Sequence, residues 1–379
     1  MTRVTIALLS TAAPNELGSM GVFGDVVKEA LTAHTSEFEV LPFSLCDPMP
    51  SSTSRLAQRL QLLERVVRAR RRSGQAKACV YHLLDGSFAY MIGKIPWSRT
   101  LITVHDLIPA LQAQGRIHAS PLGWLAKRLI NKSLERIARA GAVHAVSQNT
   151  AEDLRELTGR AADATILNPL RPLPKLQQTG GAATRHSGRS PYILHVGSNS
   201  HYKNRRGVLE IFSQVIEQRP DLRLVLAGPA PEPELRALAS VPILEPRVSF
   251  VVDPDDEELA ELYNGATLLL FPSIYEGFGW PPLEAAYYGC PVVCSRAASL
   301  PEVVGDAALM CDPADTSSFA SAVIHLISDQ PLARKLIENG YRNLKRFDDR
   351  RLGLGLSELY VKLIEKGAVR PSISMKIDL

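Results

Sequence analysis

The sequence predicts an α/β protein of two domains, each built on a parallel β-sheet that is doubly wound by helices. Short apolar runs alternate with segments of helical periodicity, which is the pattern of strands buried on both faces. A stretch rich in Pro, Gly, Gln and Ser, Arg171–Ser190, interrupts the pattern near the middle and has no hydrophobic period. The length of 379 residues suits two domains.

Nine apolar runs are predicted to be strands, and they fall into two groups around that interruption. The runs before it are 4–10, 78–84, 100–105 and 142–147. The runs after it are 192–196, 222–227, 248–252, 267–271 and 291–294. Because helical segments separate consecutive runs, we expect parallel rather than antiparallel pairing.

These groups define the expected domain boundaries. We predict an N-terminal domain at residues 1–170, a linker at 171–190 and a C-terminal domain at 191–350. The last segment, 351–379, contains apolar residues at helical spacing over 352–366, so it is predicted to form an amphipathic helix followed by a tail.

Charge is spread unevenly along the chain. Residues 1–180 hold 22 Lys and Arg against 14 Asp and Glu, whereas the remainder holds 21 against 25. The segment Arg55–Arg72 alone has seven arginines and one glutamate, with apolar residues along one side. It is either a solvated helix on a sheet face or a helix that contacts an anionic membrane surface. We expect no nucleic-acid partner.

Cysteine usage and hydropathy point to a cytoplasmic protein, peripheral to the inner face of the membrane if Arg55–Arg72 binds lipid. Five cysteines are an odd number in a large chain, which favours reduced, buried thiols. No apolar run approaches the roughly 20 residues that span a bilayer. The apolar stretch Val4–Leu9 is shorter than a signal-peptide core, so it is interpreted as the first buried strand.

The most informative segment, 271–294, runs from an apolar strand through a glycine turn into a helix. Gly277 and Gly279 let the backbone approach a ligand closely, and the helix N-terminus favours phosphate. Glu276 in the turn and Glu284, expected in the first helical turn, can each accept hydrogen bonds from vicinal sugar hydroxyls. A capping role alone also accounts for Glu284, because acidic residues favour first turns.

The spacing Glu276-x7-Glu284 resembles the E-x7-E signature of retaining glycosyltransferases with the GT-B fold, especially glycosyltransferase family 4 and its mannosyltransferases. Residues 289–309 are also similar to that family, and the resemblance is thinner over the N-terminal half. It implies two facing Rossmann-like domains, with the donor in the C-terminal one. It also implies that the C-terminal helix returns to the N-terminal domain.

The family resemblance assigns a role to each part of this segment. The first glutamate contacts hydroxyls of the transferred sugar and the second holds the nucleotide ribose, which implies these roles for Glu276 and Glu284. The backbone N–H groups of Gly277, Phe278 and Gly279 would face the sugar and the phosphates.

A second element resembles the family's motif of a VG pair followed by a lysine that neutralises the donor diphosphate. Lys203, followed by Asn204, is that candidate; a solvated loop lysine is the alternative. A fixed cation there lowers the barrier because negative charge builds up on the leaving diphosphate. Many relatives carry an arginine directly after the VG pair, where this chain has Ser198. Arg205 or Arg206 are candidates to compensate.

Weaker signals mark the remaining candidates. Gly21 lies in a glycine-rich stretch that is expected to form a loop against the diphosphate or the acceptor. His105 resembles the histidine of the family's HD-L-x-P element, near the transferred sugar; a polar pair ending a strand is the alternative. Val252 is expected beside the nucleotide base. His82 and Asp85 are weaker candidates, for which a structural role is favoured.

One acidic run requires a separate interpretation. Asp253-Pro-Asp255-Asp256 has the Asp-x-Asp pattern that can hold a divalent metal in another transferase fold. It also precedes a predicted helix, where acids stabilise the first turn, so we interpret it as a cap. Lys203 and the helix terminus supply the positive charge, and we therefore expect no metal or cofactor.

The sequence thus predicts a retaining, metal-independent hexosyltransferase that uses a nucleotide sugar, with GDP-mannose favoured and UDP- or dTDP-linked sugars as alternatives. The expected acceptor is a saccharide or a lipid-linked saccharide, in cell-surface polysaccharide or glycan biosynthesis. A sugar-nucleotide epimerase and a non-catalytic sugar-nucleotide sensor are the two other classes that the motifs allow.

Overall fold

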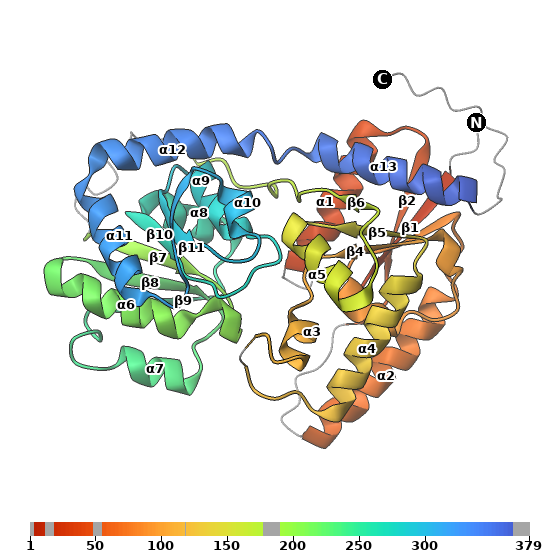
Figure 1. The fold of residues 1–379 in the computed structure, drawn as a ribbon, viewed down its shortest axis with the longest axis horizontal. Helices are drawn as coiled ribbons and strands as arrows, with labels where there is room; N and C mark the ends of the chain where they lie inside the picture. The colour runs from red at the N-terminus through yellow and green to blue at the C-terminus, as the bar shows by residue number, and fades with distance from the viewer. Residues whose placement is uncertain (1–3, 12–18, 48–54, 118, 177–189, 367–379) are drawn as a thin grey trace. The chain divides into compact units, whose positions relative to one another are not determined.

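The computed structural model describes residues 4–11, 19–47, 55–117, 119–176 and 190–366 (Figure 1). Within these ranges, no helix is both long and apolar enough to cross a bilayer.

The chain divides into two compact units. Unit 1 contains Met1–Arg171 and Asp348–Leu379, and unit 2 contains Pro172–Phe347. Part of the expected linker packs on unit 2, because Leu173 and Leu176 lie against its core and the Tyr288 hydroxyl donates to the carbonyl of Pro174 (2.9 Å). Most of the remainder of that stretch lies outside the described residues.

Unit 1 is a six-stranded, fully parallel sheet in the order β2-β1-β3-β4-β5-β6. Its elements are β1 (Val4–Ser10), α1 (Ser19–His34), β2 (Phe38–Ser44), α2 (Arg55–Ser73), β3 (Val80–Leu83), η1 (Gly86–Met91), η2 (Trp97–Arg99), β4 (Thr100–Val104), α3 (Ile108–Ala113), α4 (Trp124–Arg139), β5 (Ala142–Ala145), α5 (Gln148–Thr158), β6 (Ala164–Thr165) and α13 (Asp349–Lys366).

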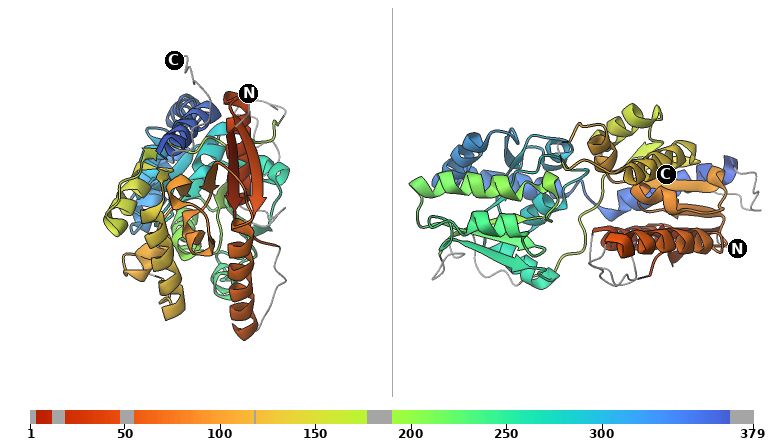
Figure 2. Two further views of the ribbon diagram at one scale, coloured as in Figure 1. Left: turned by 90° about the vertical axis from the view of Figure 1, so that its right-hand side faces the viewer. Right: turned by 90° about the horizontal axis from the view of Figure 1, so that it is seen from below.

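Helices cover both faces of this sheet, as a doubly wound fold requires. Alternate residues of β3 point to opposite faces. Tyr81 and Leu83 join the core under α2 and α4, whereas His82 bonds to Tyr360 of α13. Helix α13 packs along α1 so closely that a Cβ on Gly353 would lie 2.6 Å from a carbonyl oxygen of α1. The C-terminal helix is therefore part of unit 1 (Figure 2).

Unit 2 is also a parallel six-stranded sheet, in the order β12-β11-β10-β7-β8-β9. Its elements are β7 (Tyr192–Val196), η3 (His201–Lys203), α6 (Arg205–Gln218), β8 (Arg223–Gly228), α7 (Pro233–Ala239), β9 (Val248–Val252), α8 (Asp256–Gly265), β10 (Leu268–Phe271), α9 (Trp280–Tyr287), β11 (Val292–Ser295), α10 (Leu300–Val304), β12 (Ala308–Cys311), α11 (Thr316–Ser328) and α12 (Gln330–Leu344).

The predicted fold class is confirmed, and all nine predicted strands exist. The three strands that the sequence did not reveal, β2, β6 and β12, are all edge strands. An edge strand is partly exposed, so it lacks the continuous apolar run of a central parallel strand. Strand β2, for example, is exposed at several positions and contains Pro42.

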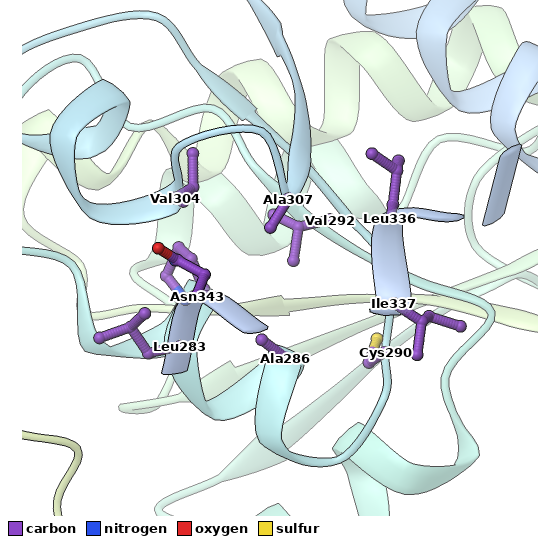
Figure 3. A pocket seen from close by; sticks show the side chains of 10 residues that line it. Leu283, Ala286, Cys290, Val292, Val304, Ala307, Leu336, Ile337 and Asn343 are labelled. Atoms are coloured by element: carbon purple, nitrogen blue, oxygen red, sulfur yellow. The ribbon is translucent and has the colours of Figure 1, made fainter. Parts of the chain in front are cut away.

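A small cavity of about 10 Å³ lies between α9 and α12 (Figure 3). Apolar side chains make up most of its lining, including Leu283, Ala286 and Leu336. It has room for about one water molecule, and neither Glu276 nor Glu284 lines it. The cavity is a packing gap behind α9 and is separate from the candidate site described next.

Candidate active site

The candidate site is built on the loops that follow β7 and β10 of unit 2. These strands are neighbours, and the strand order reverses between them: the chain runs from β7 through β8 to β9, then continues from β10 through β11 to β12. Open α/β sheets bind ligands in the crevice outside the carboxyl ends of the strands at such a switch point. The predicted motifs therefore lie where the topology favours a ligand.

The loop after β7 is fixed by its backbone and by Asn204. Asn204 adopts the left-handed conformation (φ 55°) and caps α6 by accepting from the N–H of Gly207 (3.1 Å). Its side-chain amide also donates to the carbonyl of Pro272 after β10 (3.0 Å). The N–H of Ile274 donates to the carbonyl of Tyr202 (2.7 Å). These bonds hold the loop that carries Lys203 against the loop that carries Glu276.

The glycine turn is supported from behind by Ser299, a residue that sequence reasoning did not select. Its buried hydroxyl lies 2.9 Å from the carbonyl oxygen of Glu276 and 2.6 Å from that of Phe278. Gly279 ends the turn at φ 119° and precedes α9. Its positive φ favours glycine, and a Cβ there would also lie 2.9 Å from the terminal methyl of Leu300, which would have to shift.

Lys203 and Glu276 form a bidentate ion pair in this structure. The Lys203 Nζ atom lies 2.8 Å from Oε1 and 2.9 Å from Oε2 of Glu276. The side chains are 16% and 7% exposed. The ammonium also lies 5.4 Å from the centre of the Phe271 ring, within cation–π range. Two residues that are 73 positions apart in the sequence are thus brought together as a partly desolvated charge pair.

Glu284 lies on α9 and accepts a hydrogen bond from the hydroxyl of Tyr263 on α8 (2.9 Å). Both side chains are buried. The expectation that Glu284 lies in the first helical turn is wrong, because α9 begins at Trp280 and Glu284 is its fifth residue. A capping role therefore does not account for Glu284, and its carboxylate is held by a side chain from a neighbouring helix.

The remaining donor-site candidates of unit 2 have different surroundings. Ser198 bonds to the Ser200 hydroxyl (3.1 Å). The buried Arg205 guanidinium donates to the Asn199 side chain, next to Ser198, and to a backbone carbonyl of the loop after β8. Arg206 is exposed and pairs with Glu210. Of the two arginines, Arg205 thus brings its charge beside position 198. Val252, at the end of β9, is 49% exposed.

His195, at the start of the VG element, is a buried polar residue that the sequence prediction did not include. Its Nδ1–H donates to the carbonyl of Leu270 (3.0 Å), and Nε2 is buried without a hydrogen-bond partner in the described structure. A Cβ on Gly197 would lie 3.0 Å from Nε2. Burial lowers the pKa of His195 to about 3, so its imidazole is neutral.

In unit 1, the imidazole of His105 is neutral and makes one hydrogen bond to the backbone. Its Nε2–H donates to the carbonyl of Leu84 (2.9 Å), which leaves Nδ1 as an acceptor. The ring packs edge-on against Phe23 at 4.4 Å. Desolvation lowers the pKa of His105 to about 4.

His82 is part of a buried hydrogen-bond chain across the sheet, as a structural role predicts. The Tyr360 hydroxyl bonds to His82 Nδ1 (2.7 Å), and His82 Nε2 to the Thr103 hydroxyl (2.7 Å). Thr103 bonds to His144 Nδ1 (3.0 Å), and His144 Nε2 to the carbonyl of Ile166 (2.9 Å). A carbonyl only accepts, so the chain has one fully satisfied direction, with both histidines protonated on Nε2.

Two other expectations for unit 1 are resolved. Asp85 caps η1 by accepting from the N–H of Ser87 (2.9 Å). The prediction of a glycine-rich loop is wrong for residues 19–24, because α1 begins at Ser19 and Gly21 lies in its first turn. Gly18 lies outside the described residues.

The acidic run before α8 is a helix cap. Asp255 accepts from the N–H of Glu258 (2.8 Å), and the Glu258 side chain accepts from the N–H of Asp255 (3.2 Å), which completes a capping box. Across the described residues, no group of three or more His, Cys, Asp or Glu side chains is arranged to hold a metal ion.

Two observations are typical of the GT-B fold. Each unit is a doubly wound parallel sheet, and a glycine turn with charged side chains lies at the switch point of unit 2. Residues 181–343 match the family described as glycosyl transferases group 1. The fold is similar to that of sucrose-phosphate synthase (tll1590) from Thermosynechococcus elongatus, with a TM-score of 0.73 and 22% identity over 96% of this chain and 100% of that one. It is also similar to Anabaena Alr3699/HepE in complex with UDP-glucose, with a TM-score of 0.70 and 17% identity over 94% and 99%.

A sequence relative is the O-antigen chain mannosyltransferase B of Escherichia coli, which is 35% identical over 41% of this chain. The matched region spans 42% of that relative's length. The chain therefore has the GT-B fold, as the sequence resemblance predicted, and its residues 181–343 match a glycosyltransferase family. Membership of glycosyltransferase family 4 stays a prediction.

Proposed function

We propose that this protein is a retaining glycosyltransferase that moves a hexose, with mannose favoured, from a nucleotide sugar to a saccharide or lipid-linked saccharide. The proposed setting is cell-surface polysaccharide or glycan biosynthesis on the cytoplasmic side of the membrane. The observation that carries the proposal is the cluster of Lys203, Glu276 and Glu284 around a glycine turn at the switch point of unit 2.

Each group in the cluster has a chemical task in this proposal. Glu276 accepts hydrogen bonds from hydroxyls of the transferred sugar, and Glu284 from those of the ribose. Lys203 and the N-terminus of α9 stabilise the negative charge that develops on the leaving diphosphate. They supply positive charge without a metal ion.

The proposed reaction is a front-face substitution at the anomeric carbon. The bond from that carbon to the donor phosphate oxygen breaks, and the acceptor oxygen bonds on the same face. The acceptor proton passes to the departing phosphate oxygen, which balances the step and retains the configuration. His105, neutral and with Nδ1 free to accept, is proposed to bond to a hydroxyl of the transferred sugar.

The mannose preference is supported by the similarity to O-antigen chain mannosyltransferase B, and GDP-mannose is accordingly the favoured donor. A UDP-linked donor is the alternative, supported by the likeness of the fold to HepE in complex with UDP-glucose. A thermal-shift screen of GDP-, UDP- and dTDP-sugars distinguishes them, because a ligand that binds only the folded state raises the unfolding temperature. The strongest shift is expected with GDP-mannose.

The transfer itself is tested with Glu276→Ala. We expect transfer to fall by at least a hundredfold with the fold intact, because the sugar contact is lost while the loop remains held by Ser299. Glu261→Ala, which removes an exposed carboxylate of the same unit, is the control. Full activity of Glu276→Ala contradicts the assignment. Epimerised sugar nucleotide without acceptor would favour an epimerase, and tight binding without turnover would favour a sensor.

Helix α2 is proposed to contact the anionic membrane surface. Its buried residues Val66 and Ala69 pack on the sheet, as in the solvated-helix interpretation. Its outer side nevertheless exposes Leu63 (55%) and Val67 (49%) next to arginines. Exposed apolar residues among cations are typical of a helix that lies in a membrane interface.

The experiment is sedimentation with anionic and with neutral phospholipid vesicles. Binding is expected only to the anionic vesicles, to weaken with salt, and to weaken at least fivefold in Leu63→Asp/Val67→Asp. Leu238→Asp, at an exposed leucine of unit 2, is the matched control. Equal binding of the double variant and the wild type contradicts the membrane role.

A further inference from the structure

The ion pair in the candidate site joins two of the groups that the proposed function assigns to the donor, Lys203 and Glu276. Both carboxylate oxygens of Glu276 are within 2.9 Å of the Lys203 ammonium. With the Glu276 side chain only 7% exposed, little of its charge is solvated by water. The two opposite charges therefore neutralise each other at this point.

This pairing is held by the surrounding loops and is not an incidental surface contact. The bond from the Ile274 N–H to the Tyr202 carbonyl fixes the backbones of both loops one or two residues from the pair. The Asn204 side chain makes a second tie between them. Lys203 can move because its side chain is long, whereas Glu276 sits on a turn that Ser299 supports.

A diphosphate and the Glu276 carboxylate are both anions, and both need the Lys203 ammonium. If a nucleoside diphosphate takes the ammonium, the poorly solvated Glu276 loses its compensating charge, which is unfavourable. The hydroxyls of an intact donor sugar can replace the lost hydrogen bonds, since hydroxyls donate to carboxylates. An intact nucleotide sugar thus satisfies both residues, and a nucleoside diphosphate satisfies only one.

We propose that the Lys203–Glu276 pair is an exchangeable counter-ion lock, through which Glu276 selects the intact nucleotide sugar over the free nucleoside diphosphate. The inference rests on the proposed function of the site. It gives Glu276 a second task besides holding the sugar, which is to oppose binding of the product nucleotide. It also makes diphosphate recognition and sugar recognition interdependent.

The test is calorimetric titration with GDP, UDP, GDP-mannose and UDP-glucose, on the wild type and on Glu276→Gln. The substitution keeps the shape of the side chain but removes the charge that competes for Lys203. We expect the variant to bind the preferred nucleoside diphosphate about tenfold more tightly than the wild type, while its affinity for the intact donor does not rise. The exposed-site variant Glu261→Gln controls for the overall change in protein charge. Equal or weaker binding of the nucleoside diphosphate by Glu276→Gln overturns the lock.

A double-mutant cycle separates the lock from simple charge repulsion. In a Lys203→Met background, Glu276→Gln should give no gain for the nucleoside diphosphate, because there is no ammonium to release. A tenfold gain that persists without Lys203 overturns the lock in favour of repulsion. If Lys203→Met does not fold, Lys203→Gln replaces it, with unfolding curves checking both.

The proposed function and the lock fail in different ways. If none of these four ligands binds the wild type or any variant, and no dTDP-sugar does so in the thermal-shift screen, the proposed function is overturned and the lock with it. If nucleoside diphosphate binds the wild type as tightly as the intact donor, the lock alone is overturned. A wild-type preference of at least tenfold for the intact donor, reduced in Glu276→Gln, supports the lock.

Discussion

The two units use the same scaffold, a six-stranded parallel sheet with helices on both faces, but they bury different polar groups in it. Unit 1 carries a neutral chain of hydrogen bonds from Tyr360 through His82 and His144, with every donor and acceptor satisfied. Unit 2 carries the ion pair of Lys203 and Glu276. A satisfied neutral chain specifies packing, whereas a charge pair can exchange partners with a ligand.

The largest stability effect is expected where the unit 2 site depends on a close backbone approach. Gly228 has φ 140°, and a Cβ there would lie 2.3 Å from the carbonyl oxygen of Gly197. Gly228→Ala should therefore lower the free energy of unfolding by about 4 kcal/mol, from strain and from the clash. Gly159→Ala in unit 1 is the control, because its φ is 71° but no atom lies within 4 Å of the added Cβ. A control loss equal to that of Gly228→Ala, in urea unfolding, would contradict this account.

The second largest effect is expected from acid, which should destabilise unit 1 more than unit 2. Burial lowers the pKa of His105 and His144 to about 4, and lowers that of His82, whereas in unit 2 the pKa of His195 is lowered to about 3. As the pH drops below about 6.5, these histidines bind protons in the unfolded chain but not in the folded chain. The free energy of unfolding therefore decreases as the pH decreases. From pH 7 to pH 5, unit 1 should lose roughly 3 kcal/mol, more than unit 2.

Two carboxyls of unit 1 act in the opposite direction. Burial raises the pKa of Asp85, and raises that of Asp153 to about 6, so the folded state binds their protons first and gains stability as pH falls. Two such groups offset only part of the effect of three histidines. Protection factors from hydrogen exchange, compared peptide by peptide at pH 7 and pH 5, report each unit separately. If unit 2 lost protection at a higher pH than unit 1, the prediction that acid destabilises unit 1 more would be wrong.

The neutral chain can be broken at its first donor. Tyr360→Phe removes the hydroxyl that bonds to His82 Nδ1 and leaves a buried acceptor unsatisfied, which should cost about 2 kcal/mol of unfolding free energy. Tyr341→Phe, at a tyrosine that is 48% exposed, should change stability by less than about 0.5 kcal/mol. Nucleotide affinity of folded Tyr360→Phe should be unchanged. Equal effects of the two substitutions in chemical denaturation would remove the special role of the chain.

The smallest expected effect concerns the acidic run before α8. Asp255→Ala removes one half of the capping box and should lower the free energy of unfolding by about 1 kcal/mol. Mg²⁺ or Mn²⁺ should not raise the unfolding temperature of either the wild type or the variant. A metal-dependent rise that Asp255→Ala abolishes would restore the metal-site interpretation.

The sequence analysis predicted the features that depend on local pattern. The central strands are continuous apolar runs, and β1, β7 and β9 begin and end at the predicted residues. Gly21 shows the limit of such reasoning, since a glycine-rich stretch was expected to be a loop and residues 19–24 are helical. Neighbouring helix formers outweigh isolated glycines when one face of the helix is buried.

Long-range side-chain pairing was outside the reach of the sequence. The family resemblance assigned Lys203 and Glu276 to one donor site, but no pattern showed that their charges pair. The same holds for Ser299 behind the glycine turn and for the contact of Tyr263 with Glu284. Such contacts depend on which rotamers the packed chain allows, and a single sequence does not encode them as a motif.

Helix α13 has a consequence for synthesis of the chain. It belongs to unit 1, yet the ribosome makes all of unit 2 between residue 171 and the start of this helix. Until α13 is made, the apolar surface of unit 1 that receives it stays uncovered while nearly 200 residues are added, which takes roughly 10–40 s at about 5–20 residues per second. Unit 2 is continuous and can finish folding first, although its first residue is made later. A translational pause before residue 349 should then expose nascent unit 1 to chaperones.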